Sequence, residues 1–145
     1  MNRQSMGLPK IEFTPWIPWK QRNEKVNPKA PGVYVLAKFA AAPTGNANPL
    51  DKDVIYFGET CRSLKGRWRQ FEISAFQGKR AHSGGSNYRE AFKNSGENLY
   101  VAALPVTEER LPNKKLRNSF IRYVERKLLL DWVAKFKKMP KCNKK

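Results

Sequence analysis

The sequence predicts an α+β domain in which helices flank a small three-stranded antiparallel sheet, with elements in the order β-β-α-α-β-α. Two runs of β-branched and aromatic residues come early in the chain, and a third precedes a long, strongly apolar helical pattern. A stretch with helix-like periodicity separates the second run from the third. The length of 145 residues and the hydrophobic content of 40% suffice for one compact domain with a packed core. A sheet with helices on its faces is the simplest fold that buries all of these elements.

The first 30 residues are predicted to form an arm that packs on this core. The segment has no clean periodicity, but it contains Trp16 and Trp19 within five residues rich in apolar side chains. Exposed paired tryptophans are costly, so packing on the domain is favoured over a free linker. The organisation we expect is therefore an arm at 1–30 and a core domain at 31–145 that ends in a basic tail.

The first two strands are expected to form an antiparallel hairpin with a long loop. Val33–Phe39 follows a Pro-Gly pair, and Val54–Phe57 is stopped by Gly58. Residues 40–52 between them contain proline, glycine and asparagine throughout, which is typical of turns.

A helix is predicted to begin after Ser63, which is a plausible N-cap residue. Leu64, Trp68, Phe71 and Ala75 are spaced so that they share one helical stripe. The stripe predicts a helix that buries this face against the sheet.

The remaining elements follow from turn residues and hydrophobic runs. A loop is expected at 78–85, after which Ser86 caps a short helix. A third strand is predicted at Leu99–Leu104 and a long helix at Lys114–Phe136.

The charge balance points to a polyanionic partner. The net charge is +17, with a pI near 10.2, and nucleic acid is the commonest polyanion bound by small basic domains. The only histidine is His82, so nuclease sites that need two histidines in one chain are excluded. The three aspartates are scattered, which argues against a two-metal carboxylate cluster.

No membrane-spanning stretch and no signal-peptide pattern are evident in the sequence. The two cysteines are too few for a disulfide framework or a zinc site. These features predict a protein of the reduced cytoplasm, associated with the nucleoid and not with a membrane.

Four short segments contain the candidate catalytic residues. They are Gly32-Val33-Tyr34, Tyr56-Phe57-Gly58, the helical segment Leu64–Trp68 with Arg67, and Val124–Lys127 with Glu125. In this order and at these spacings they resemble the GIY-YIG nuclease family. The resemblance covers residues 31–143 and implies a compact, free-standing, metal-dependent endonuclease that hydrolyses DNA phosphodiester bonds.

The resemblance also implies the roles of the site residues. Tyr34 and Tyr56 would point into the site, Arg67 would contact the scissile phosphate, and Glu125 would hold a single Mg²⁺ or Mn²⁺ ion. Asn143 matches an asparagine found near the end of many members. We expect Tyr34 to act as the general base, because the strongly positive domain and a metal would favour its phenolate form.

Glu125 is also singled out by its helical neighbours. It interrupts an apolar face formed by Ile121, Leu128, Leu129 and Trp132. A carboxylate there is expensive unless a metal or an arginine compensates it. The two explanations are a catalytic metal ligand and a structural ion pair.

Three further candidates would support catalysis. Lys38 lies one position beyond Ala37, where several family members carry a lysine, so that it could substitute only if the strand has a bulge. Phe71 occupies a position where some members have a histidine. His82 precedes two glycines in a loop whose backbone amides could meet a phosphate. Together with Lys38 and His82, the third candidate is Asn143.

Double-stranded DNA is the expected partner, and a homodimer would allow both strands to be cut. Non-specific contacts to the DNA backbone are predicted for surface cations. These are Arg62, Lys65, Arg69, Lys79, Arg80, Arg89 and the lysine tail.

Two other classes of function remain open at this stage. One is a non-catalytic protein that keeps the same fold and binds DNA or structured RNA. The other is an RNA-binding protein in which Trp16, Trp19 and Tyr88 stack on bases.

Overall fold

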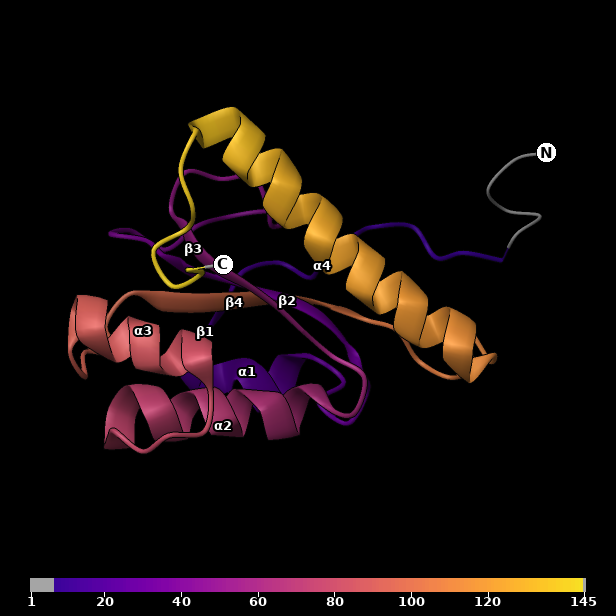
Figure 1. Ribbon diagram of the computed structural model, residues 1–145, viewed down its shortest axis with the longest axis horizontal. Helices are drawn as coiled ribbons and strands as arrows, with labels where there is room; N and C mark the ends of the chain where they lie inside the picture. The colour runs from indigo at the N-terminus through magenta and orange to yellow at the C-terminus, as the bar shows by residue number, and fades with distance from the viewer. Residues whose placement is uncertain (1–6, 145) are drawn as a thin grey trace.

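The structure is a computed structural model that describes residues 7–144. Residues 1–6 of the predicted arm and Lys145 of the predicted tail lie outside the described residues. The chain forms an α+β fold with a four-stranded antiparallel sheet and helices on both faces (Figure 1). The strands are β1 (Ile17–Pro18), β2 (Gly32–Lys38), β3 (Val54–Thr60) and β4 (Leu99–Pro105). The helices are α1 (Arg22–Lys25), α2 (Leu64–Gln77), α3 (Ser83–Phe92) and α4 (Lys114–Phe136), with a short 3-10 turn η2 at Trp19–Gln21.

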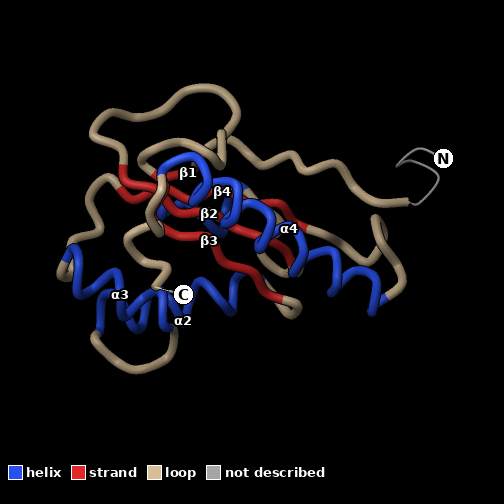
Figure 2. The backbone as a smooth tube through the Cα atoms, turned by 45° about the horizontal axis from the view of Figure 1, so that its top comes forward, coloured by secondary structure: helices blue, strands red, loops and turns tan. Residues whose placement is uncertain are grey.

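The sheet has four strands and not the three that the sequence predicts. Its order is β1-β4-β2-β3, which Figure 2 shows from the side of α4. The additional strand comes from the N-terminal segment, where Ile17 pairs with Val101. The backbone N–H of Thr14 also donates to the carbonyl of Ala103 at 2.9 Å. A two-residue strand next to prolines is too short to show a period of two, so the sequence pattern could not reveal it.

The predicted hairpin of β2 and β3 is confirmed, and it contains a bulge in β3. Leu36 pairs with Tyr56, but Ala37 pairs with Val54, so that Ile55 is the extra residue. Ile55 and Tyr56 therefore pack into the same core, although they are adjacent in sequence. The bulge lies opposite the end of β2 and leaves the alternation of β2 itself intact.

Alternating residues of β2 face two separate cores. Val33 and Val35 pack toward α4, whereas Tyr34 and Leu36 pack toward α2 and α3. In Figure 1, α4 crosses one face of the sheet, and α2 and α3 lie on the other. The sheet thus forms the middle layer of three, and both of its faces are covered.

The C-terminal tail runs along the outer edge of β3. The backbone N–H of Cys142 donates to the carbonyl of Ile55 at 2.8 Å. The side chain of Asn143 accepts from the N–H of Phe57 at 2.9 Å and donates to its carbonyl at 3.1 Å. These contacts satisfy backbone groups that an edge strand would otherwise expose. Part of the predicted basic tail is therefore an ordered cover of the sheet.

The two long helices have the predicted starting points. Ser63 caps α2 by accepting from the N–H of Gly66 at 3.1 Å, and α4 spans the predicted range. The prediction for α3 is wrong: His82 is its N-cap, and the helix begins three residues before Ser86. Its first turn contains Gly84, a poor helix former, which obscured the start in the sequence.

None of the helices in the described part of the chain is both long and apolar enough to cross a membrane.

Replacement of Trp19 tests whether the N-terminal segment is part of the folded domain. Trp19 is buried, packs on Trp68 and Phe71, and donates from Nε1 to Glu72. Trp19→Ala should lower the free energy of unfolding by about 3–5 kcal/mol in urea titrations. Trp16→Ala, which removes a partly exposed ring, should cost clearly less. Equal and small losses for the two variants would show that the segment is dispensable.

Candidate functional site

Two buried tyrosines lie side by side on the sheet face that α2 and α3 cover. Tyr34 is fully buried, Tyr56 is 8% exposed, and their ring centroids are 6.0 Å apart. Glycines make this arrangement possible. A Cβ atom on Gly58 would lie 2.5 Å from Cζ of Tyr34, and one on Gly84 would lie 2.5 Å from Cε1 of Tyr56. Gly58 of the Tyr-Phe-Gly segment and Gly84 of α3 are thus required by close packing around the two phenol rings.

His82 joins α3 to this pair through a hydrogen bond of 2.9 Å between its Nε2 and the hydroxyl of Tyr34. The other ring nitrogen, Nδ1, accepts from the backbone N–H of Gly85 at 3.1 Å. Burial, followed by the positive charge of Arg67, lowers the pKa of His82 to about 3, so the ring is neutral at pH 7. Because Nδ1 accepts, the single ring proton lies on Nε2. His82 therefore donates to the oxygen of Tyr34 and cannot take its proton.

The electrostatic surroundings of Tyr34 differ from the expectation. Burial raises the pKa of Tyr34 well above its usual value of about 10, a neighbouring charge on Tyr56 raises it further, and Arg67 lowers it. Burial also raises the pKa of Tyr56 to about 12. Without a metal ion, desolvation outweighs the effect of Arg67, so the phenolate form of Tyr34 that the sequence predicts would require the additional positive charge of a bound metal.

Arg67 is positioned by α2 at the border of the buried helical stripe. Its guanidinium donates to Gln70 at 2.7 Å and is near enough to influence the pKa values of Tyr34, Tyr56 and His82. The side chain is half-buried. Arg67 also lines a hollow in which its guanidinium can meet an anion.

Glu125 reaches the same region from α4, on the opposite face of the sheet. Its residue is only 8% exposed, and burial raises the pKa of its carboxyl. The single ion pair of Glu125 joins it to Arg126 at 3.5 Å among the residues described, and the Arg126 side chain is 75% exposed. Such an exposed contact contributes little to stability. The structural ion pair considered above thus accounts poorly for this buried carboxylate.

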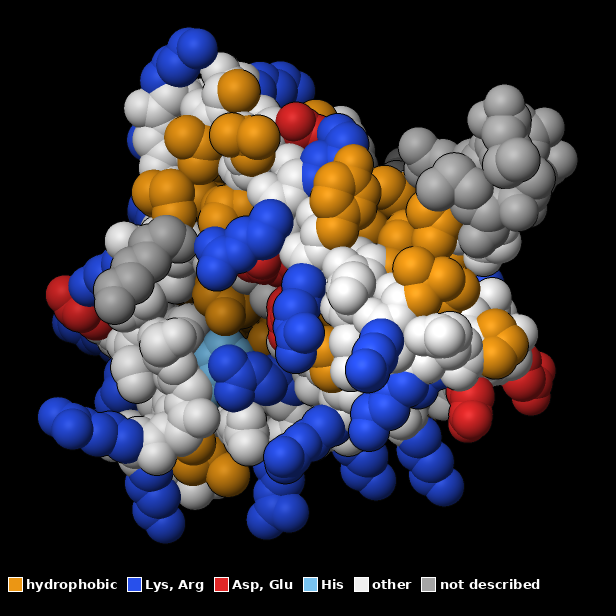
Figure 3. Space-filling model, turned by 45° about the vertical axis from the view of Figure 1, so that its right-hand side comes forward, with side chains coloured by type: hydrophobic (Ala, Val, Ile, Leu, Met, Phe, Trp, Pro, Cys, Tyr) orange, Lys and Arg blue, Asp and Glu red, His pale blue; other side chains and the backbone are white. Residues whose placement is uncertain are grey.

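Two adjoining hollows bring these side chains together at the edge of β3. The first, about 350 Å³ in volume, is lined by Arg67 and Glu125 together with Tyr56. The second, about 470 Å³, shares Tyr56 and Glu125 and extends to Asn143. Figure 3 shows Lys and Arg side chains around a depression in which the pale-blue His82 is visible. The four residues predicted for catalysis therefore converge around one basic hollow, with Tyr34 directly behind Tyr56.

The donor set of this hollow fits one loosely held divalent cation. No group of three or more His, Cys, Asp or Glu residues that could enclose a metal occurs within residues 7–144. Glu125 and Glu59 line the first hollow together. Mg²⁺ is usually held by one or two carboxylates together with substrate phosphate and water. Because the residues that line the first hollow include two carboxylates but no His or Cys, they suit such an ion better than zinc.

The three residues predicted to support catalysis, Lys38, His82 and Asn143, lie in different parts of the structure. His82 contacts Tyr34 directly, and Asn143 lines the second hollow while it holds the tail on β3. The structure does not bring Lys38 to the hollow. Its ammonium donates to the hydroxyl of Tyr88 at 3.0 Å and to the carbonyl of Glu97 at 2.5 Å, on the sheet face of Tyr34 but four residues farther along β2.

The predicted DNA-contacting cations are all exposed and lie on α2 and α3 or in the segments next to them. Arg80 lines a shallow hollow beside His82. Arg89 is also used structurally, because its guanidinium donates to the carbonyl of Ala75 at 3.3 Å. The full set comprises Arg62, Lys65, Arg69, Lys79, Arg80 and Arg89.

Sequence reasoning missed residues that complete the hollow. Arg122 and Arg126 line it from α4, and Arg122 approaches Glu59 at 3.9 Å. Their spacing of four residues, on either side of Glu125, was the available signal.

Ser74 was also missed: its hydroxyl accepts from the backbone N–H groups of Ala81 and His82 at 2.9 and 2.8 Å and so fixes the loop that presents His82.

Comparisons of this chain with protein-family models, with curated proteins and with solved structures gave no match.

A methyl group at Gly58 should disturb the tyrosine pair. Gly58→Ala places the new Cβ within 2.6 Å of both Cζ and the hydroxyl of Tyr34. We expect a loss of about 1–3 kcal/mol in unfolding free energy and shifted NMR signals of the Tyr34 and Tyr56 rings. Gly96→Ala is the matched control, because its new contacts at 3.7 Å are ordinary. Unchanged ring signals in Gly58→Ala would contradict this packing.

The stability of the protein should depend on pH through His82. Its folded pKa of about 3 lies below the unfolded value of about 6.5, so the unfolded chain binds the proton first as the pH falls. The stabilising contribution of neutral His82 is complete above pH 6.5 and is lost toward pH 3, at up to ~1.4 kcal/mol per pH unit.

His82→Asn isolates this effect, because the asparagine keeps a side-chain oxygen for the N–H of Gly85. The difference in unfolding free energy between the wild type and this variant should shrink steadily from pH 6.5 to pH 4. A difference that does not change with pH would exclude a buried, neutral His82.

Proposed function

We propose that the protein is a metal-dependent endonuclease that hydrolyses DNA phosphodiester bonds in a GIY-YIG-type site. The observation that carries the proposal is the convergence of Tyr56, Arg67 and Glu125 on one hollow, although they come from three elements in different layers. This convergence joins the four sequence segments that resemble the GIY-YIG nucleases. The basic surface around the hollow suits a DNA backbone.

Phosphodiester hydrolysis needs charge stabilisation, an oriented water and a proton for the leaving oxygen. The guanidinium of Arg67 binds the scissile phosphate and offsets the negative charge that develops on it. Glu125 would hold Mg²⁺ or Mn²⁺, and Glu59 lies beside it in the hollow. When bound, the ion would supply Lewis-acid polarisation of the phosphate and an acidified water.

The two tyrosines and His82 provide the proton-handling side of the site. The phenolate of Tyr34 is the proposed base, and His82 and Arg67 both stabilise negative charge on its oxygen. Tyr56 lies between Tyr34 and the hollow, so the attacking water would give its proton to the hydroxyl of Tyr56, whose own proton moves to the phenolate of Tyr34. Because burial raises the pKa of both phenols, the reaction should accelerate as the pH rises through the neutral range.

Double-stranded DNA is the proposed substrate, which the exposed cations on α2 and α3 contact through its backbone. A homodimer of the chain would place a second hollow on the other strand. The proposal locates the protein in the cytoplasm at the nucleoid, where its substrate is found.

The alternative function is a non-catalytic protein that binds DNA or structured RNA through the same basic surface. This alternative predicts that binding of nucleic acid requires the positive charge around the hollow but does not require the carboxylate of Glu125. The hypothesis that Trp16, Trp19 and Tyr88 stack on RNA bases is weakened, because Trp19 and Tyr88 are buried.

Glu125→Gln separates the nuclease from the binding protein. This substitution should reduce Mg²⁺-dependent nicking of a supercoiled plasmid by at least 100-fold, because it removes the negative charge that holds the ion. Binding of a labelled duplex in EDTA and the unfolding midpoint should remain close to those of the wild type. EDTA should also abolish nicking by the wild-type protein.

Glu108→Gln is the matched control, since Glu108 is an exposed acid away from the hollow. It should leave nicking unchanged. If Glu125→Gln unfolds the protein, Glu125 is a structural residue. Full nicking activity in a folded Glu125→Gln variant would refute the proposed role of this carboxylate.

A further inference from the structure

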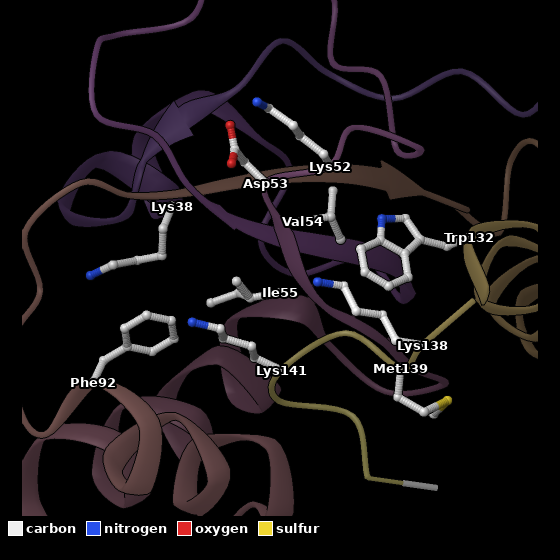
Figure 4. Close-up of a pocket in the computed structure, with 10 residues that line it drawn as sticks. All are labelled: Lys38, Lys52, Asp53, Val54, Ile55, Phe92, Trp132, Lys138, Met139 and Lys141. Carbon is white, nitrogen blue, oxygen red and sulfur yellow. The ribbon is translucent and has the colours of Figure 1, made fainter. Parts of the chain in front are cut away.

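A second pocket, with a volume of about 360 Å³, lies farther along the edge of β3, between the ends of α3 and α4 (Figure 4). Four lysines line it against a single carboxylate, that of Asp53. The lysines come from β2, the loop before β3 and the C-terminal tail: Lys38, Lys52, Lys138 and Lys141. The floor is apolar and includes Ile55, Phe92 and Trp132.

The lysines of this pocket have no carboxylate close enough for an ion pair within residues 7–144. The ammonium groups of Lys38 and Lys141 lie 4.9 and 5.3 Å from the centroid of the same ring, that of Phe92. In Figure 4 the ammonium of Lys138 extends toward Ile55, while Asp53 extends with Lys52 away from Phe92. Like charges gathered on an apolar floor repel one another, so an anion bound between them would be stabilised.

One of these ammonium groups is fixed in place before any ligand binds. Lys38 is held by the hydroxyl of Tyr88 and the carbonyl of Glu97, whereas Lys138 and Lys141 are exposed and free to adjust. A pocket with one anchored and several adaptable cations suits a group whose charge is spread over several oxygens. A phosphate diester matches the lysines, and the C–H groups of an attached deoxyribose match the floor.

The pocket and the two hollows follow one another along β3. Val54 and Ile55 line the pocket, Tyr56 and Phe57 the second hollow, and Tyr56 and Gly58 the first. A strand advances about 3.3 Å per residue, so Ile55 and Gly58 are separated by about 10 Å. This length corresponds to a few nucleotides of a single DNA strand. The tail at Cys142 and Asn143 lies between the two regions.

We propose that the lysine pocket binds a backbone phosphate, with its sugar, of the DNA strand that is cleaved in the hollow beside Glu125. The identity of the strand as substrate rests on the nuclease function proposed above. The bound phosphate lies a few nucleotides from the scissile one, on the side of Ile55. The pocket thereby sets the direction in which the strand crosses the site.

Removal of two lysine charges tests the pocket in the full-length chain. Lys138→Gln/Lys141→Gln removes two cations from it, and Lys114→Gln/Lys115→Gln removes two at the other end of α4. The latter pair lies about 30 Å away along the helix, and both variants keep the same net charge. Binding of a fluorescent 20-base-pair duplex is measured by anisotropy in EDTA at several NaCl concentrations, with unfolding midpoints as a check of folding.

We expect the pocket variant to bind the duplex at least tenfold more weakly. The slope of log K against log salt should fall by about one, as for one lost phosphate contact. The control pair should stay within twofold of the wild type. Equal losses in the two variants would overturn the proposal, because the pocket would then be ordinary surface charge. An unfolded pocket variant calls for the same titration with Lys138→Gln alone, for which at least a threefold loss is expected.

This experiment is independent of cleavage. If the wild type fails to nick DNA but the pocket variant shows the selective loss, the nuclease proposal fails and the phosphate-binding pocket stands. If nicking is confirmed and the selective loss is absent, only the pocket proposal fails. Tighter binding of poly-glutamate or of an RNA hairpin than of the duplex would overturn the assignment to a DNA strand.

Discussion

The close packing of Tyr34 and Tyr56 between β3 and the first turn of α3 is the constraint on which the site depends. Gly58 and Gly84 leave room for the two rings, and only then can α3 approach closely enough for His82 to reach Tyr34. The same approach makes His82 the helix cap and fixes its tautomer. One packing requirement thus determines the geometry and the protonation state of the polar cluster.

The position of the site follows from the three-layer architecture. Arg67 belongs to the layer of α2, and Glu125 belongs to the layer of α4 on the opposite face of the sheet. Side chains from both layers can meet only around a sheet edge, and β3 is the edge strand that lies next to both. Cys142 and Asn143 of the tail pair with Ile55 and Phe57 of β3, whereas Gly58 lines the first hollow.

Most of the fold could be predicted because strong periodicity encodes it. The hairpin, α2 and α4 each contain enough apolar residues to show their period, and Ser63 caps α2 as expected. The strand β1 and the pairing of the tail with β3 could not be predicted, since they consist of a few residues stabilised by distant partners. The four residues of the proposed site could be selected from short motifs. The raised pKa of Tyr34 could not be predicted, because it arises from burial by α2 and α3, which are far from Tyr34 in the sequence.

The central claim is that Glu125 holds a divalent ion in the hollow beside Tyr56 and Arg67. Paramagnetic broadening by Mn²⁺ in the ¹⁵N-labelled chain measures this directly, without any requirement for cleavage. The account predicts that substoichiometric Mn²⁺ selectively broadens the amide signals of Gly58, Glu59 and Arg126, and that Glu125→Gln abolishes the effect. Broadening centred elsewhere, or an identical pattern in the Glu125→Gln protein, would contradict it.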